Sequence, residues 1–349
     1  MSRPTLAISQ PLRDWLRQDP AWGYMPWPLR AQLNWRAMLG SVNASLSPQP
    51  PVASDAELLF IAGPWRSGTT VMHELITAAL GWLTPQTWQC MDPTAFRLRR
   101  APTAVGAIAR PMDGLQLGAL SPQEDEFALL GLGVDSAYRA FWMPHRLGTL
   151  HHTLDPTYWQ GDGKWLDTWQ RFIDAVRGPS AQLVLKSPNH SFRMPALLGR
   201  YPNSKWVWML RDGRSVFASN RKMWGQMFAA HGLSAADPDA LDRFLALTLN
   251  RCAELLESVA LKLPPSQMAF CQQTDLRLDP EFQVHRVLGQ LGLEVGSDKH
   301  TFADALRATA QGRLDSYPDL GDLPSFCIEA IDRFDAAQQL ALSGARTSG

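Results

Sequence analysis

The sequence has few cysteines, no excess of either charge and no long apolar run, and each absence excludes a class of protein. The four cysteines are widely spaced and form no C-x-x-C pair, which argues against a disulfide framework or a zinc site. With 33 basic and 33 acidic residues, the chain lacks the broad positive field that duplex nucleic acid attracts. We therefore expect neither nucleic acid nor a metal ion as a partner.

Membrane and export segments are also missing from the sequence. No apolar run approaches the roughly 20 residues that span a bilayer, and the charges at Arg3, Arg13 and Asp14 interrupt any apolar core of a signal peptide. We expect a cytoplasmic protein without a transmembrane segment. Nothing in the sequence indicates its oligomeric state.

The chain is long enough, at 349 residues with 45% hydrophobic residues, to bury a large core. Residues 1–55 read as an N-terminal helical extension that ends in a proline-rich linker, 56–330 as the main domain, and 331–349 as the end of a helix and a tail. Trp15, Trp22, Trp27 and Trp35 are expected to pin this extension onto the main domain. The alternative is that they form a wall for an apolar substrate or a membrane-surface contact.

Strands and helices are predicted to alternate through the main domain. Expected strands are 58–62, 183–185, 206–210 and 268–271, and expected helices are 70–80, 124–132, 165–176, 191–200, 240–262 and 281–291, with another from Gly213. For the helix over 124–132, Ser121 is the expected N-cap and Pro122 the first helical position. This pattern predicts an α/β fold with a parallel sheet between two helical layers, in which ligands bind at the carboxyl ends of the strands.

The loop between the first strand and its helix is suited to bind an anion, because helix N-termini present free N–H groups and a positive dipole end. It runs Gly63-Pro64-Trp65-Arg66-Ser67-Gly68-Thr69-Thr70. The two glycines have the spacing of an ATP-binding P-loop, but Thr69 takes the place of its lysine. The loop therefore predicts a phosphate-like ligand without the cation that is specific for nucleoside triphosphates.

Two more cations follow predicted strands. Arg211 ends the strand over 206–210, with Ser219 eight residues later, and Lys186 ends the strand over 183–185. An arginine offers a planar fork for a phosphate, and an early helical hydroxyl can join it.

Together these segments resemble the sulfotransferases that use 3′-phosphoadenosine 5′-phosphosulfate (PAPS), in the form found in their bacterial and tyrosylprotein branches. The resemblance covers roughly residues 57–325 and implies a P-loop-like three-layer fold. It implies that Pro64 to Thr70 bind the 5′-phosphosulfate, and that Arg211 and Ser219 bind the 3′-phosphate. It also implies that Lys186 contacts the sulfuryl and bridging oxygens, that the product is 3′,5′-adenosine bisphosphate, and that no metal is needed.

The resemblance leaves the general base open. Cytosolic animal members of this family have a histidine two residues after the lysine, where this chain has Pro188, and His190 follows two positions later. The acids at Glu124 and Glu126 could instead complement a helix dipole, or one of them could take the acceptor's proton. Glu126 is the preferred candidate, with Glu124 and His190 as alternatives.

Three further positions are less specific. His73 either lines the acceptor pocket or belongs to the core. Arg313 is a candidate nucleotide contact in a loop that only loosely resembles the family's late loop. Val71 stands where the animal enzymes have the tryptophan that stacks on adenine, so the stacking residue is unassigned.

The sequence thus predicts transfer of a sulfuryl group from PAPS to an acceptor hydroxyl or amine by in-line displacement, with Arg66, Lys186 and the loop N–H groups stabilising the leaving phosphate. A small amphipathic or aromatic acceptor is expected, and a peptide tyrosine is possible. Two alternatives stay open: a kinase or NTPase related to the P-loop enzymes, and a catalytically silent nucleotide-binding module.

Overall fold

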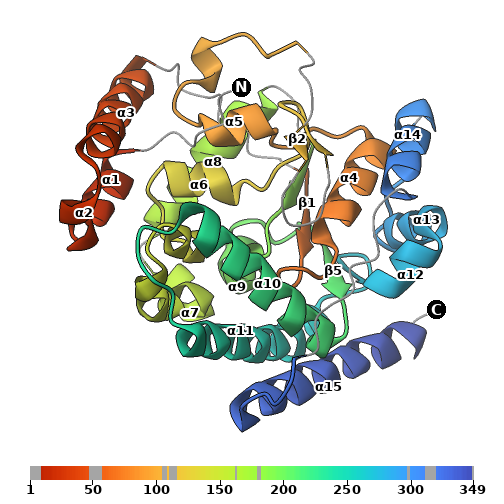
Figure 1. Ribbon diagram of the computed structural model, residues 1–349. Coiled ribbons are helices and arrows are strands. Elements are labelled where there is room, and N and C mark those ends of the chain that lie inside the picture. Colours follow the sequence, from red (N-terminus) through yellow and green to blue (C-terminus); the bar gives the residue numbers. More distant parts are fainter. Residues whose placement is uncertain are drawn as a thin grey trace.

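A parallel four-stranded sheet lies at the centre of the protein (Figure 1). The computed structural model describes residues 9–46, 57–103, 108–109, 116–161, 163–178, 182–296, 299–310 and 320–347. The sheet has the order β4-β1-β5-β6, formed by β4 (Gln182–Lys186), β1 (Glu57–Ala62), β5 (Lys205–Leu210) and β6 (Met268–Gln272). Because all four strands run in one direction, Ala62, Lys186 and Leu210 end at the same edge of the sheet.

Helices cover both faces of the sheet, which explains why its strands are apolar without alternation. Along β1, Leu58 and Phe60 face one core, and Leu59 and Ile61 face the other. The second core is covered by α4 (Thr69–Leu80), α12 (Gln273–Leu278), α13 (Pro280–Gln290) and α14 (Lys299–Ala310).

The larger core lies on the opposite face and is rich in tryptophan and phenylalanine. Its covering helices are α5 (Thr87–Met91), α6 (Glu126–Gly131), α7 (Pro156–Trp159), α8 (Lys164–Arg177), α9 (His190–Arg200), α10 (Gly213–His231), α11 (Pro238–Ser258) and α15 (Ser325–Thr347). Short 3₁₀ helices lie at Phe96–Leu98, Ala137–Phe141, Pro144–Leu154 and Ala260–Lys262, and a small antiparallel pair is formed by β2 (Ile108–Ala109) and β3 (Gln116–Leu117). The helices on this face, the sheet and the helices over the second core make the predicted three-layer α/β fold.

The N-terminal extension forms α1 (Gln10–Arg17), α2 (Ala21–Tyr24) and α3 (Trp27–Leu46), on the left of Figure 1. The Ser9 N–H donates to the Gly131 carbonyl over 2.9 Å, and Arg146 stacks 4.3 Å from the centre of the Trp15 ring. Trp15 therefore does pin the extension to the main domain. Trp27 and Trp35 do not, because 73% and 58% of their surfaces are exposed.

Two predicted helix boundaries differ clearly from the structure. Helix α6 begins at Glu126 with Asp125 as its N-cap, and not at Pro122, because Pro122 bridges to Gln86 and keeps the preceding segment extended. The helix predicted over 240–262 ends at Ser258 and is followed by a 3₁₀ turn. Residues 331–347, expected as the end of a helix, belong to α15, which packs along α11 (Figure 1).

The cysteines and the helices of the described residues bear on two expectations, namely that the protein has no disulfide framework and no transmembrane segment. All four cysteines are buried and unpaired, so they form no disulfide framework. Among the described helices, none combines the length and apolarity that crossing a bilayer requires.

Gly63, directly after β1, should not tolerate a side chain. Its φ of 126° is disfavoured for other residues, and a Cβ there would lie 2.7 Å from the Met209 carbonyl oxygen on β5. We expect Gly63→Ala to lower the free energy of unfolding by at least about 1–3 kcal/mol, measured by urea denaturation.

Gly199→Ala is the matched control, because this exposed position in α9 has open space around a Cβ. The control should be neutral, or more stable by up to about 1 kcal/mol. Equal stability of the two variants would contradict the close approach of the loop to β5.

Candidate functional site

The loop after β1 reaches the start of α4 through two left-handed residues. Arg66 has a φ of 70° and Gly68, the N-cap of α4, a φ of 97°. No side chain caps this helix end, and the first N–H groups of any helix have no partner within the helix. The loop therefore presents backbone donors at the positive end of α4, as an anion site requires.

Arg66, Arg211 and Ser219 come together beside this loop, although they are far apart in the sequence. Arg66 Nε donates to Ser219 Oγ over 2.9 Å, and Arg211 Nη1 donates to the Arg66 carbonyl. Asn220, the next residue of α10, donates to the Trp65 carbonyl over 2.8 Å. The start of α10 is thus bonded to the loop, which places two guanidinium groups and a hydroxyl in one cluster.

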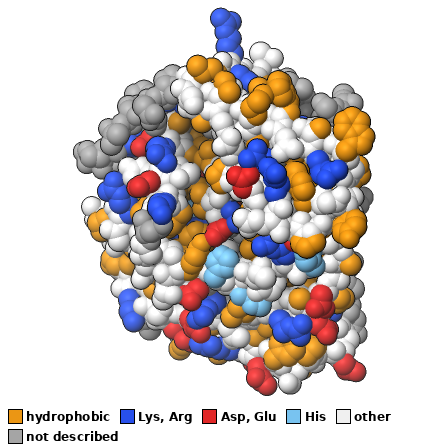
Figure 2. All heavy atoms as spheres, turned by 90° about the vertical axis from the view of Figure 1, so that its left-hand side faces the viewer, with side chains coloured by type: hydrophobic (Ala, Val, Ile, Leu, Met, Phe, Trp, Pro, Cys, Tyr) orange, Lys and Arg blue, Asp and Glu red, His pale blue; other side chains and the backbone are white. Residues whose placement is uncertain are grey.

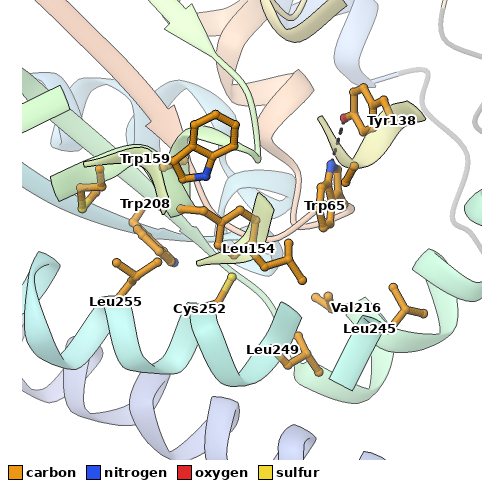
Figure 3. Close-up of a cluster of buried hydrophobic side chains, with 14 of the residues drawn as sticks. Trp65, Tyr138, Leu154, Trp159, Trp208, Val216, Leu245, Leu249, Cys252 and Leu255 are labelled. Atoms are coloured by element: carbon orange, nitrogen blue, oxygen red, sulfur yellow. Dashed lines mark hydrogen bonds between the residues drawn. The ribbon is translucent and has the colours of Figure 1, made fainter. Parts of the chain in front are cut away.

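A buried ion pair lies at the end of β4. Lys186 Nζ lies 2.6 Å from Glu124 Oε1 and donates to Thr70 Oγ1 over 3.3 Å. Tyr138 donates to the other oxygen of Glu124 over 2.7 Å and accepts from Trp65 Nε1 over 2.9 Å, the interaction drawn in Figure 3. This chain of bonds connects β4, the segment before α6 and the loop after β1.

Tyr138 is fixed as a hydrogen-bond donor in this chain. Burial, together with the negative charge of Glu124, raises the pKa of Tyr138 well above its ordinary value. The phenol therefore keeps its proton, and Glu124 Oε2 accepts the hydrogen bond that it donates.

Asp125 and Glu126, the two acids that follow Glu124, bond other residues than Lys186. Asp125 bonds His190 Nε2 over 2.8 Å, and all of this pair is buried. Burial alone would raise the pKa of Asp125, but the His190 imidazole and the Trp169 N–H outweigh it and lower the pKa. This geometry holds His190 as a structural partner of Asp125.

Glu126 opens α6 and pairs with Arg193 of α9, with neither side chain exposed. Arg193 also lies over the Trp159 ring at 4.2 Å. Of the three consecutive acids, Glu124 is the one that bonds Lys186, and it keeps 9% of its surface exposed where the other two keep none.

His73 of α4 is buried and bonded to Thr84 Oγ1 over 2.6 Å. Burial lowers the pKa of His73 to about 3, and the nearby positive charge of Lys186 acts in the same direction. The imidazole is therefore neutral near neutral pH. Its Nδ1 has no hydrogen-bond partner among the described residues.

The C-terminal helix fixes the turn between β5 and α10. The Gln338 amide accepts from the Arg211 N–H over 2.8 Å and donates to the Arg211 carbonyl over 3.0 Å. Asp335, one turn earlier, accepts from the Gly213 N–H over 2.8 Å and from the Gln338 amide over 2.9 Å. Helix α15 thereby sets the position of the Arg211 backbone.

The other residues predicted to bind the nucleotide differ in where their side chains lie. Ser67 Oγ donates to the Pro64 carbonyl over 2.8 Å, and Trp65 points into the larger core (Figure 3), so both serve the shape of the loop. Thr69 is buried at the start of α4. Arg313 lies outside the described residues.

Sequence reasoning missed Tyr138, Asn220 and Gln338. Asn220 could have been noticed because it directly follows Ser219. Tyr138 and Gln338 lie in segments without a motif, and they bond Trp65 and Arg211 across 73 and 127 residues of sequence.

The described residues fit a PAPS molecule in their chemistry. An uncapped helix end and a lysine next to it suit the 5′-phosphosulfate, and the Arg66–Arg211–Ser219 cluster carries the donors that a second phosphate needs.

Comparison with known sequences identifies the family. The sequence model described as "Sulfotransferase family" matches residues 59–297, more than half of the chain. The chain therefore belongs to the sulfotransferase family, as the loop and strand-end motifs predicted.

Two curated relatives are each 31% identical over 244 residues. They are the omega-hydroxy-beta-dihydromenaquinone-9 sulfotransferase Stf3 of Mycobacterium bovis and its namesake from Mycobacterium tuberculosis. The match covers 67% of this chain and 62% of each relative, so the chain spans less than two thirds of their length.

Two solved structures share the fold. The first is the sulfotransferase STF1 from Mycobacterium tuberculosis H37Rv, with a TM-score of 0.56 and 18% identity; the match covers 88% of this chain and 84% of that one. The second is the sulfotransferase STF9 from Mycobacterium avium, with a TM-score of 0.55 and 16% identity; the match covers 83% of this chain and 77% of that one. At such identities they support the three-layer fold alone.

The pKa of His73 predicts a pH-dependent stability. Because the folded state lowers this pKa from 6.5 to about 3, the unfolded chain binds one more proton between these values. The ionisation of His73 therefore has no effect on stability above pH 6.5 and destabilises the fold as the pH falls below that value, by up to about 1.4 kcal/mol per pH unit.

His73→Gln should remove this slope, whereas His285→Gln, at an exposed position of α13, should keep it. The measurement is the free energy of unfolding by urea from pH 4 to 7. Parallel curves for wild type and His73→Gln would contradict a neutral, buried imidazole.

Proposed function

We propose that the protein transfers a sulfuryl group from PAPS to the hydroxyl of an amphipathic or aromatic acceptor. The observation that carries this proposal is the Lys186–Glu124 ion pair beside Thr70, because it places a cation and a base together at the uncapped end of α4. Membership of the sulfotransferase family supports it.

PAPS would supply the sulfuryl group and a leaving phosphate on which negative charge develops. The loop N–H groups and the Lys186 ammonium would donate to that charge, and such prearranged donors act most strongly where charge builds up. Arg66, with its carbonyl bonded to Arg211 and its Nε to Ser219, would connect the 5′ and 3′ ends of the nucleotide site.

Glu124 would accept the proton of the acceptor hydroxyl. It is favoured over Glu126 because Glu126 is fully buried in its pair with Arg193. It is favoured over His190 because the Nε2 of that residue is bonded to Asp125. Tyr138 donates to the second oxygen of Glu124 and Lys186 to the first, so the acceptor hydroxyl would take the place of the lysine at the first oxygen.

The acceptor class rests on the relatives. Their name describes a dihydromenaquinone with a hydroxyl at its omega position. The surroundings of Glu124 are apolar, since Phe127 and Phe141 pack 5.5 and 4.8 Å from the ring of its partner Tyr138. A peptide tyrosine is the alternative acceptor.

Nucleotide preference tests the donor. We expect 3′,5′-adenosine bisphosphate to raise the melting temperature of the protein, and ATP with magnesium to raise it much less. Stabilisation by ATP with magnesium alone would contradict the proposal and support a kinase-like enzyme.

Arg211→Ala should weaken binding of 3′,5′-adenosine bisphosphate about 10-fold or more, because a charge-assisted phosphate contact is lost. Binding of adenosine 5′-phosphate, which has no 3′-phosphate, should change little. Both dissociation constants can be measured by calorimetry.

Arg243→Ala, which removes an exposed arginine of α11, is the control and should leave both constants unchanged. Equal losses for the two nucleotides in Arg211→Ala would remove the assignment of Arg211 to the 3′-phosphate.

Glu124→Gln should lower kcat for sulfuryl transfer about 100-fold or more, because an amide cannot take the acceptor's proton. Binding of the bisphosphate should stay within a few-fold of wild type. The control is Glu57→Gln, the same change at the opposite end of β1. An unchanged kcat in Glu124→Gln would exclude Glu124 as the base.

A further inference from the structure

The outer face of α3 carries a stripe of exposed large apolar side chains. Six lie on this helix with between 38% and 73% of their surface exposed, namely Trp27, Trp35, Met38, Leu39, Val42 and Leu46. With about 100° of rotation per residue, all six fall within a sector of about 120°. We call these six residues the α3 stripe.

The stripe is not the side by which α3 packs on the protein. Ala37 and Gly40 are buried, and Leu33 packs against the larger core, all on the opposite side of the helix. The helix is therefore apolar on two sides, and one of them faces outward.

The charges on the α3 segment itself have one sign. Between Asp19 and Asp55 the sequence contains no acidic residue, and its charged residues there are Arg30 and Arg36. By helical rotation the two arginines lie about 60° beyond opposite edges of the stripe. Figure 2 views this side of the molecule, where hydrophobic, basic and acidic side chains are exposed.

We propose that the α3 stripe docks the protein on a lipid bilayer that carries anionic headgroups. Tryptophans favour the boundary between water and hydrocarbon, and arginines beside an apolar face can reach lipid phosphates while their stems stay in apolar surroundings. Helix α3 would lie in the plane of the membrane.

A second copy of the chain suits this surface less well. In a two-fold interface, the same face meets itself. Arg30 would then approach the same face of its own copy, and residues 20–54 contain no acidic residue to pair with it. Charge complementarity thus favours an anionic surface.

This inference connects with the proposed function, because an apolar quinone-like acceptor resides in membranes, but its test needs neither nucleotide nor turnover. The full chain is floated on a density gradient with phosphatidylcholine vesicles, with and without phosphatidylglycerol. Wild type should float with the anionic vesicles and be released from them by salt.

Trp35→Gln/Val42→Gln should weaken binding to anionic vesicles about 10-fold or more, and Arg30→Gln should weaken it while leaving the stripe intact. The matched control is Leu278→Gln/Phe282→Gln, which removes two exposed apolar side chains from α12 and α13. The control should bind as wild type does.

Two results would overturn the proposal. One is wild-type protein that stays unbound, or a control that loses as much binding as the stripe variant. The other is a wild-type dimer, seen by sedimentation, that the stripe variant converts to a monomer without any change at vesicles.

Discussion

The buried pair of Lys186 and Glu124 is the interaction on which the site depends. Removing two opposite charges from water is costly, and such a pair is tolerated only when hydrogen bonds satisfy its remaining atoms. Here Thr70 accepts from the lysine and Tyr138 donates to the glutamate. The pair therefore requires the end of β4, the start of α4 and the segment before α6 to meet beside the anion loop.

Two sets of hydrogen bonds hold the anion loop beside this pair. Trp65 connects the anion loop to Tyr138, so the loop and the carboxylate share one hydrogen-bonded chain. On the other side, α15 holds the backbone of Arg211 and Gly213, and Arg211 in turn donates to the loop at Arg66. A helix at the far end of the sequence thus contributes to the geometry of a loop near its beginning.

Local patterns predicted the elements and the family well, because apolar runs and the loop motif are contained in short stretches of sequence. The four strands and the ends Lys186 and Arg211 follow from such runs, and the family match confirmed the resemblance. The choice among Glu124, Asp125 and Glu126 did not follow, because it depends on which of Lys186, His190 and Arg193 each acid meets. The start of α6 was misplaced for a related reason, since the bridge between Pro122 and Gln86 is a tertiary contact. The site residues themselves stay predictions.

Sulfuryl transfer from PAPS is the central claim, and a reaction with two labelled donors tests it most directly. The full-length protein is incubated with a hydroxylated isoprenoid quinone, PAPS labelled with ³⁵S and ATP labelled with ³²P on its γ-phosphate. The account predicts ³⁵S in the quinone, no ³²P, and loss of the ³⁵S product in Lys186→Ala. A quinone that carries ³²P, or ³⁵S that is released as inorganic sulfate at the same rate with and without acceptor, would contradict it.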